Sequence, residues 1–269
     1  MKNLFRMFRS IYEYLVLYLG LLYFTVAGLT FTVLCAVLYI VLPRNTGVWF
    51  GRKAIGLLFR SYLAMLRATG LMKLDLSALD TLRGERGLIV APNHPSLLDA
   101  VFVISRLPDI ACIMKAEIRD NLVLGGGARL AGYIRNDTAG NMVREAAREL
   151  RSGQQLLVFP EGTRTREKPV NAFKGGFALI AKQAGTPLQT VFIETNSPFL
   201  SKGWPILKKP QLPVIYRARL GERFEVSGDV KAFVSTLESY YRQELQSAPA
   251  QPASTSAADT AVGNSATAS

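Results

Sequence analysis

The 269-residue sequence is poor in histidine and cysteine, and this scarcity removes several kinds of functional site. It contains one histidine, His94, and two cysteines, Cys35 and Cys112. A structural zinc site takes about four His or Cys ligands, so no metal is expected. The two cysteines are poorly placed to form a disulfide, which argues against a disulfide-built secreted domain and favours a reducing compartment.

Motifs of several other protein classes are also missing. No Gly-x-Ser-x-Gly elbow is present to expose a nucleophilic serine. The run Gly125-Gly126-Gly127 lacks the glycine spacing of a dinucleotide fingerprint, so we expect a flexible loop there and no organic cofactor. The arginines lack the interleaved aromatic side chains of a single-strand nucleic-acid groove. We therefore interpret the net charge of +12 as favouring an anionic membrane surface, and we expect no nucleic-acid partner.

Charge is absent from one long stretch, residues 14–42. As a straight helix it would run roughly 43 Å at 1.5 Å per residue, against a hydrocarbon core of about 30 Å. We expect it to be embedded in a membrane, either as one helix or as a hairpin bent near Gly20 or Gly28. A signal peptide fits poorly because the apolar region is too long. Basic residues flank the stretch on both sides, so both ends could lie in the cytoplasm.

The segment at about 48–70 has the pattern of an amphipathic basic helix. Five apolar residues recur at helical spacing, and three basic residues repeat every seventh position (Ile55, Leu58, Phe59, Tyr62 and Leu66; Lys53, Arg60 and Arg67). Such a helix either lies on the bilayer or packs its apolar stripe on the rest of the protein. Residues 1–74 are accordingly predicted to form a membrane anchor.

Beyond residue 74, short apolar runs alternate with helical stretches, which is an α/β pattern. The predicted strands are 88–90, 110–114, 156–159 and 188–193, with a hairpin of 214–220 and 224–226 around Gly221. The predicted helices are 96–106, 138–153, 175–184 and 229–246. We assign residues 75–246 to one folded domain. Residues 247–269, dominated by Ala, Ser, Thr, Pro and Gly, are predicted to be a disordered tail.

Two strings in this domain carry candidate chemistry. In Asn93-His94-Pro95-Ser96-Leu97-Leu98-Asp99, an apolar run ends in a turn and a carboxylate follows the histidine five positions later. An imidazole can accept a proton near neutral pH, and a carboxylate can orient it and stabilise the imidazolium. Ser96 is interpreted as a helix N-terminal residue. A surface or satisfied core histidine is the alternative.

The second string, Pro160-Glu161-Gly162-Thr163-Arg164, follows the apolar run 156–159. Gly162 permits close backbone approach, Thr163 offers a hydroxyl, and Arg164 presents a planar fork of donors suited to phosphate or carboxylate. The alternative is a tight turn with a solvated arginine, which would show the same sequence.

Together, the strings NHPSLLD and FPEGTR resemble the motif pair of the glycerolipid acyltransferase family, whose best-known members are the 1-acylglycerol-3-phosphate O-acyltransferases. The resemblance runs from about residue 88 to about residue 191. Two further family blocks are altered here. Gly132-Tyr133-Ile134-Arg135 is a shortened form of the middle motif, and Pro187-Leu188-Gln189-Thr190 keeps one of the two usual prolines.

The resemblance implies an α/β fold with a mixed sheet flanked by helices, behind a membrane-embedded helical segment. It implies an O-acyltransferase that moves an acyl group from acyl-CoA or acyl-ACP to a lysophospholipid hydroxyl, with 1-acylglycerol-3-phosphate as the first choice. His94 would be the general base and Asp99 its orienting partner. The substrate-binding residues would be Asn93, Arg135, Glu161, Gly162, Thr163, Arg164 and Lys174, and the last of these has a solvated lysine as its alternative.

Two rival functions remain. The altered blocks at Gly132 and Pro187 motivate the same chemistry on a different lyso-lipid or lipid-like acceptor. The other rival is a membrane protein of the same fold that binds lipid without catalytic turnover. The intact His94 and Asp99 argue against it. In each case the partner is membrane lipid. The expected location is a bacterial inner membrane with the catalytic domain on the cytoplasmic face.

Overall fold

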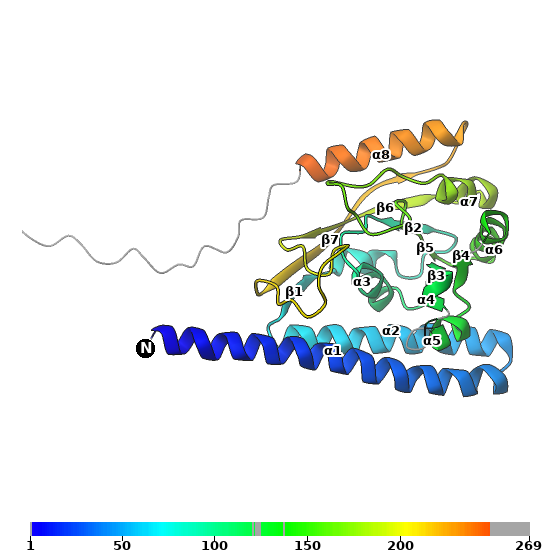
Figure 1. Cartoon of the computed structure of the whole chain (residues 1–269). Coiled ribbons are helices and arrows are strands. Elements are labelled where there is room, and N and C mark those ends of the chain that lie inside the picture. The colour runs from blue at the N-terminus through cyan, green and yellow to red at the C-terminus, as the bar shows by residue number, and fades with distance from the viewer. Residues whose placement is uncertain (1, 120, 122–124, 137, 248–269) are drawn as a thin grey trace, which may run out of the picture.

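The computed structural model describes residues 2–119, 121, 125–136 and 138–247. Its helices and strands form a layered α/β domain that lies on two long antiparallel helices (Figure 1). The predicted disordered tail falls outside the described residues except for Ser247. The elements are α1 (Lys2–Val41), α2 (Arg44–Ala68), β1 (Met72–Asp75), η1 (Ser77–Leu82), β2 (Ile89–Pro92), α3 (Asp99–Arg106), β3 (Ala111–Lys115), α4 (Ala116–Arg119), α5 (Gly125–Leu130), β4 (Ile134–Asn136), α6 (Ala139–Arg151), β5 (Leu156–Leu157), α7 (Gly176–Ala184), β6 (Leu188–Thr195), β7 (Val214–Phe224) and α8 (Val230–Ser247).

The described strands form one seven-stranded sheet in the order β1-β7-β6-β2-β5-β3-β4. The strands from β6 to β4 run parallel to one another, whereas β7 is antiparallel to β6 and β1 runs parallel to β7. The central strands β2 and β5 are entirely buried, which explains why they appear in the sequence as continuous apolar runs. The predicted mixed sheet flanked by helices is confirmed.

Each face of the sheet is covered by its own helices and has its own core. On one side Phe102 and Tyr216 pack with side chains of α2 and α3, and on the other Phe192 and Tyr241 pack with α6, α7 and α8. Each of these four side chains is completely buried. Burial of a large apolar side chain contributes roughly 1.5–3 kcal/mol, so both layers hold the central strands in place.

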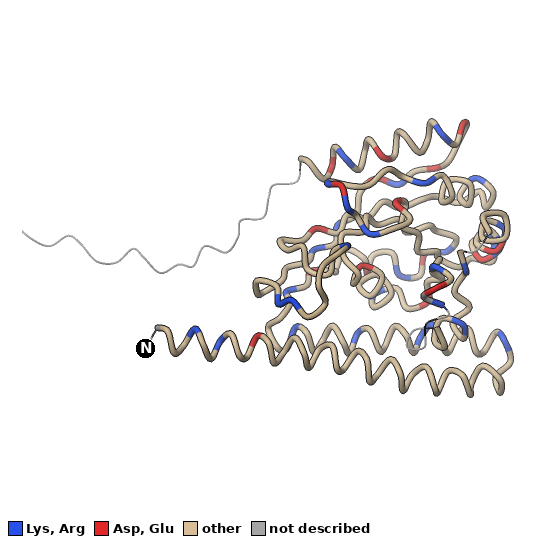
Figure 2. Tube along the Cα trace, in the orientation of Figure 1, with Lys and Arg blue, Asp and Glu red and all other residues tan. Residues whose placement is uncertain are grey.

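Helix α1 runs without a break through Gly20 and Gly28, so the alternative of a bent hairpin within residues 14–42 is wrong. Among the described residues it is the one helix long and apolar enough to cross a membrane, and only 17% of its most apolar window is buried. Figure 2 shows the helix without charged residues beyond Glu13. It follows the domain surface, because Val16, Leu17 and Cys35 are buried against neighbouring elements.

Helix α2 packs its apolar stripe on the domain, with Ile55, Tyr62 and Leu66 buried. Its Arg52 is only 2% exposed and pairs with Glu149 of α6 at 2.9 Å. The Arg52 guanidinium also donates to the carbonyl oxygen of Ala131 at 3.0 Å and to the Gln154 side-chain oxygen at 2.8 Å. Of the two positions considered for this helix, the structure therefore shows the packed one.

Two local predictions are wrong. Gly125–Leu130 is a buried helix, α5, rather than a flexible loop. A Cβ at Gly126 would lie 2.8 Å from Thr32, and one at Gly127 would lie 2.5 Å from Phe31, so glycine allows α5 to lie directly against α1.

The predicted hairpin around Gly221 is a single long strand, β7. A Cβ at Gly221 would come within 2.4 Å of the Phe192 ring and 2.6 Å of the Thr190 hydroxyl. The glycine therefore marks a close approach of β7 to β6 rather than a turn.

Candidate active site

The first motif begins where β2 ends. Asn93 is 3% exposed, and its amide pairs with β6 through both of its polar atoms. Nδ2 donates to the carbonyl oxygen of Ile193 at 3.1 Å, and Oδ1 accepts the Ile193 N–H at 2.6 Å. Asn93 thus continues the pairing of β2 with β6 past the strand end and fixes the backbone that leads into His94. The side chain predicted to bind substrate lies inside the protein.

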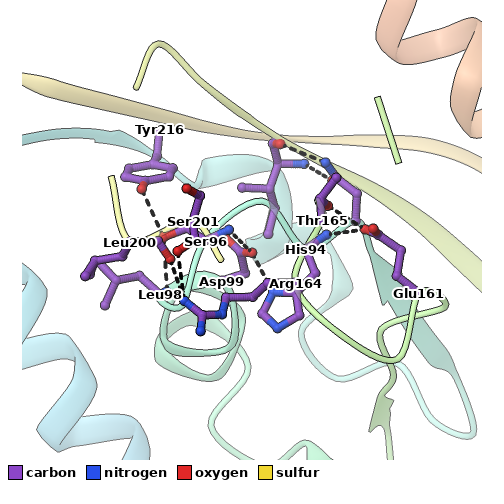
Figure 3. A network of polar contacts seen from close by, with 12 residues as sticks. His94, Ser96, Leu98, Asp99, Glu161, Arg164, Thr165, Leu200, Ser201 and Tyr216 are labelled. Carbon is purple, nitrogen blue, oxygen red and sulfur yellow. Dashed lines mark hydrogen bonds and ion pairs between the residues drawn. The ribbon is translucent and has the colours of Figure 1, made fainter. Parts of the chain in front are cut away.

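His94 and Asp99 meet across the turn between β2 and α3 (Figure 3). Nδ1 of His94 lies 2.7 Å from Oδ2 of Asp99, the first residue of α3. The Ser96 N–H donates to the same oxygen, also at 2.7 Å. The Asp99 side chain is 0% exposed and that of His94 is 16% exposed. The pair therefore has a buried carboxylate and a ring that solvent or substrate can reach.

The surroundings of the pair fix its electrostatics and its ring orientation. Burial raises the pKa of the Asp99 carboxyl, while hydrogen bonds from His94 and the Ser96 N–H oppose that rise. The His94 ring stacks on Phe159, with centroids 3.9 Å apart and an interplanar angle of 18°. With Nδ1 directed at Asp99, Nε2 is the nitrogen available to accept a proton from a substrate.

Ser96 is completely buried behind this pair. It lies in the turn before α3 rather than at the predicted helix start, because α3 begins at Asp99 with Leu98 as its N-cap. Its hydroxyl donates to the carbonyl oxygen of Phe199 at 3.2 Å and accepts from the Leu98 N–H at 3.3 Å. The Tyr216 hydroxyl lies 3.0 Å from the Ser96 hydroxyl oxygen. A serine with this set of partners braces the turn and is not presented as a nucleophile.

Glu161 joins the second motif to the first. It is 1% exposed, and its Oε1 accepts the His94 N–H at 2.9 Å and the Thr165 hydroxyl at 2.8 Å. Oε2 accepts the Asn171 N–H at 2.9 Å. The Thr165 N–H in turn donates to the carbonyl oxygen of His94 at 2.7 Å. The two motifs, far apart in the sequence, are therefore one hydrogen-bonded unit in which the Glu161 carboxylate faces inward (Figure 3).

The remaining residues of the second motif lie at the surface of the site. Gly162 has φ +66°, and a Cβ there would lie 2.9 Å from the Lys174 side chain. Only glycine therefore suits this turn, with the exposed Lys174 passing beside it. Arg164 is half-buried, and its Nη1 donates to the carbonyl oxygens of Leu200 and Ser201, each at 3.0 Å.

Sequence reasoning missed three cations beside Arg164 and Lys174. Lys202 Nζ donates to the Thr163 hydroxyl at 2.9 Å. Partial burial and the positive charges of Arg166, Lys115, Arg164 and Lys174 lower the pKa of Lys202. Five cations thus lie together, and we call them the basic cluster: Lys115, Arg164, Arg166, Lys174 and Lys202. Lys115 closes β3 at the carboxyl edge of the parallel strands, a position where sites are common. No sequence pattern could have placed Lys202 there, because the long β6–β7 connection brings it.

Arg135 lies away from the His94–Asp99 pair in the strand order, next to the strand that carries Lys115. It sits on the edge strand β4, opposite Met114 of β3, and both β3 and β5 stand between β4 and β2. Its predicted contact with substrate stays a prediction. Within the described part of the chain, no group of three or more His, Cys, Asp or Glu side chains is arranged to hold a metal ion. The arrangement is an imidazole held by a buried carboxylate, next to a group of positively charged side chains.

Residues 73–194 match the family model described as Acyltransferase. This part of the chain is therefore similar to the acyltransferase family, as the motif pair indicated.

Curated relatives share parts of the chain. A lyso-ornithine lipid O-acyltransferase of Pseudomonas aeruginosa is 32% identical over 105 residues, covering 38% of this chain and 40% of that protein. The 1-acyl-sn-glycerol-3-phosphate acyltransferase beta of Homo sapiens is 29% identical over 127 residues, 44% of this chain and 45% of that one. The corresponding enzyme of Limnanthes douglasii is 34% identical over 107 residues, 37% of this chain and 38% of that one. The chain thus matches less than half the length of these relatives.

The fold is also that of a solved structure, the 1-acyl-sn-glycerophosphate (LPA) acyltransferase PlsC from Thermotoga maritima. The TM-score is 0.68 at 20% sequence identity, over 92% of this chain and 99% of that one.

Proposed function

We propose that the chain is a membrane-bound O-acyltransferase that moves a fatty acyl group from acyl-CoA or acyl-ACP to the hydroxyl of a lysophospholipid. The observation that carries this proposal is the 2.7 Å contact between His94 Nδ1 and the fully buried Asp99 carboxylate. It leaves a positioned ring nitrogen at the surface of the site, which is what general base catalysis on an acceptor hydroxyl needs.

In this mechanism His94 Nε2 takes the proton of the acceptor hydroxyl as the hydroxyl oxygen attacks the thioester carbonyl carbon. Asp99 stabilises the resulting imidazolium. The tetrahedral intermediate collapses by breaking the carbon–sulfur bond, and the thiolate receives the proton from the imidazolium. An ester and a free thiol result, with no acyl-enzyme. A positioned general base typically contributes about 10²–10⁴-fold to such a step.

The basic cluster is the proposed site for the acceptor's negative charge. Arg164 has a planar fork of donors, and Thr163 and the open backbone at Gly162 lie next to it. Lys115, Arg166, Lys174 and Lys202 add long-range attraction for an anion. Glu161 and Asn93 were predicted to bind substrate, but we assign them a different role. Both are positioning residues, because their polar atoms are committed to the protein.

Helix α1 is the proposed lipid contact. It lies along the domain surface and exposes apolar side chains away from it, among them Phe8 at 60% and Val33 at 66%. We infer that it lies in the bilayer interface with its outer face in lipid, since a helix projecting across the membrane would lose its contacts with the domain. The intact chain should then stay with vesicles in high salt and in alkaline carbonate. Placement on the cytoplasmic face of a bacterial inner membrane stays a prediction.

The acceptor is tested directly. Detergent-purified protein is incubated with acyl-CoA or acyl-ACP and a panel of lyso-lipids, and the products are identified by mass spectrometry. We expect 1-acylglycerol-3-phosphate to be acylated, because its phosphate suits the basic cluster. A lyso-ornithine lipid is the second candidate, since a relative is named for it. A well-folded chain that acylates nothing above the His94→Ala control would instead be a lipid-binding protein of this fold.

A further inference from the structure

The connection between β6 and β7, residues 196–213, exposes two adjacent apolar side chains at its tip. Ile206 is 57% exposed and Leu207 is 63% exposed. The tip is nevertheless ordered by its own contacts. The Lys208 N–H donates to the carbonyl oxygen of Pro205 at 2.9 Å, and Trp204 Nε1 donates to the carbonyl oxygen of Lys208 at 3.1 Å. We call this segment the β6–β7 loop.

The β6–β7 loop is fastened to helix α1. Lys209 Nζ donates to the Glu13 carboxylate at 2.6 Å and to the Ser10 hydroxyl at 3.2 Å, and it lies 4.9 Å from the centroid of the Tyr14 ring. Figure 1 shows the loop, in yellow, reaching down to the N-terminal half of α1. That part of α1 is itself apolar and exposed, for example at Ile11 with 57%. The loop tip therefore extends the exposed apolar surface of α1.

The side chains of the tip have the composition of a membrane interface. Trp204 has an apolar ring with a polar N–H, and such rings collect where hydrocarbon meets headgroups. Lys208 lies over that ring, 5.1 Å from its centroid, and Lys209 follows it. Lysines beside an apolar pair suit anionic headgroups above a hydrocarbon layer. An acidic protein partner would also suit the lysines, but it would not account for the continuity with α1.

The other end of the same loop supports the candidate active site. Leu200 and Ser201 supply the two carbonyl oxygens that hold Arg164, and the Leu97 N–H donates to Leu200 as well. Leu200 has φ 57°, a left-handed conformation that is uncommon for a residue other than glycine. A backbone held in that conformation indicates that the loop is fixed by its surroundings.

We propose that the β6–β7 loop is a second lipid-contacting element, in which Ile206 and Leu207 enter the bilayer interface beside α1 and Lys208 faces the headgroups. The loop then connects the bilayer surface to Arg164, the residue whose planar guanidinium belongs to the basic cluster. The proposal rests on the membrane placement of α1 given above, but not on acyl transfer.

The sequence offers a clean probe, because it has two tryptophans and Trp49→Phe leaves Trp204 alone. The full-length variant is reconstituted into vesicles of phosphatidylcholine and phosphatidylglycerol, with and without bromine on the acyl chains near the headgroup. We expect brominated lipid to quench Trp204 fluorescence. Adding Ile206→Ser and Leu207→Ser should remove most of that quenching. Leu179→Ser on α7, 48% exposed on the opposite face of the sheet, is the matched control and should leave quenching unchanged.

Vesicle flotation of the same samples separates the possible failures. If the protein floats but Trp204 is not quenched by brominated lipid and is quenched by aqueous acrylamide, the loop faces water or a protein partner and the proposal is wrong. If the protein does not float, the membrane placement of α1 fails and the proposal fails with it. Neither result depends on whether acyl transfer is detected.

Discussion

The two halves of the candidate active site differ in how they are held. The His94–Asp99 pair has a completely buried carboxylate, a stacked ring and a braced turn. The basic cluster is half-buried or exposed, and its Arg164 is held by backbone carbonyl oxygens of one loop. Proton transfer requires a fixed distance, and a buried frame provides it. A charged headgroup has to enter and leave, and an open patch of cations permits that. Rigidity and accessibility are thus divided between two neighbouring groups of residues.

The largest effect should come from removing the base. His94→Ala should lower turnover by at least about 10²-fold, with folding and membrane association retained. Asp99→Asn should be similarly damaging, because the amide cannot stabilise an imidazolium as the buried carboxylate does. Asp109→Asn, at a carboxylate that is 55% exposed, is the control. Near-normal turnover of a folded His94→Ala protein would contradict the mechanism.

The next largest effect should depend on the acceptor. Arg164→Ala should remove about 1.5–3 kcal/mol of transition-state stabilisation, or about 10- to 150-fold in kcat/KM, for a phosphate-bearing acceptor. Its dephosphorylated counterpart should be affected much less. Arg164→Lys should not restore the preference, because a single ammonium does not reproduce a planar fork.

The exposed Arg148 of α6 offers a matched alanine variant, which should behave as wild type. Equal discrimination between the two acceptors by wild type and Arg164→Ala would show that Arg164 only braces the β6–β7 loop.

Glu161 tests whether the two halves are one unit. Glu161→Gln replaces one acceptor oxygen by an amide N–H₂ group that faces donors, so the free energy of unfolding should fall by about 1–3 kcal/mol. Thermal unfolding in detergent measures this, with the exposed Glu167→Gln as the control. The preference for a phosphate-bearing acceptor should survive in the folded fraction. An unchanged unfolding temperature would mean that the inward hydrogen bonds of Glu161 contribute little.

The smallest effect should come from the exposed side of the basic cluster. Lys202→Met should lower kcat/KM for a phosphate-bearing acceptor by about two- to fivefold, the range of an exposed ion pair. Salt should reduce the difference between wild type and variant, because exposed charges are screened. Equal activity of the two proteins at low salt would remove Lys202 from the site.

The sequence was most informative where local pattern and structure coincide. The strands before His94 and Glu161 are buried on both faces and therefore appear as apolar runs, and the candidate site could be predicted from the residues that follow them. The predictions were wrong at three glycines. Gly126, Gly127 and Gly221 looked like loop or turn residues, but they mark places where an element meets its neighbour too closely for a Cβ. Such contacts are tertiary and leave no local signal.

The basic cluster shows the same limit. Arg164 and Lys174 lie near the second motif in sequence and could be predicted. Lys202 comes from a loop after the next strand, and Lys115 from a strand on the other side of β5. The sheet order that gathers them is set by long-range packing. The inward direction of the Asn93 and Glu161 side chains was also hidden, because a motif gives the residue type and not the orientation of the side chain.

The contact between α5 and α1 has a consequence for protein engineering. Phe31 and Thr32 lie against glycines of α5, and Cys35, one turn further along α1, is completely buried. Helix α1 is therefore shaped to this domain on one side while it is apolar on the other. An unrelated transmembrane helix of equal length and hydropathy would reproduce only the second property. Helix α1 is therefore not an exchangeable module, and a chimera that keeps the domain must also keep the inner face of α1.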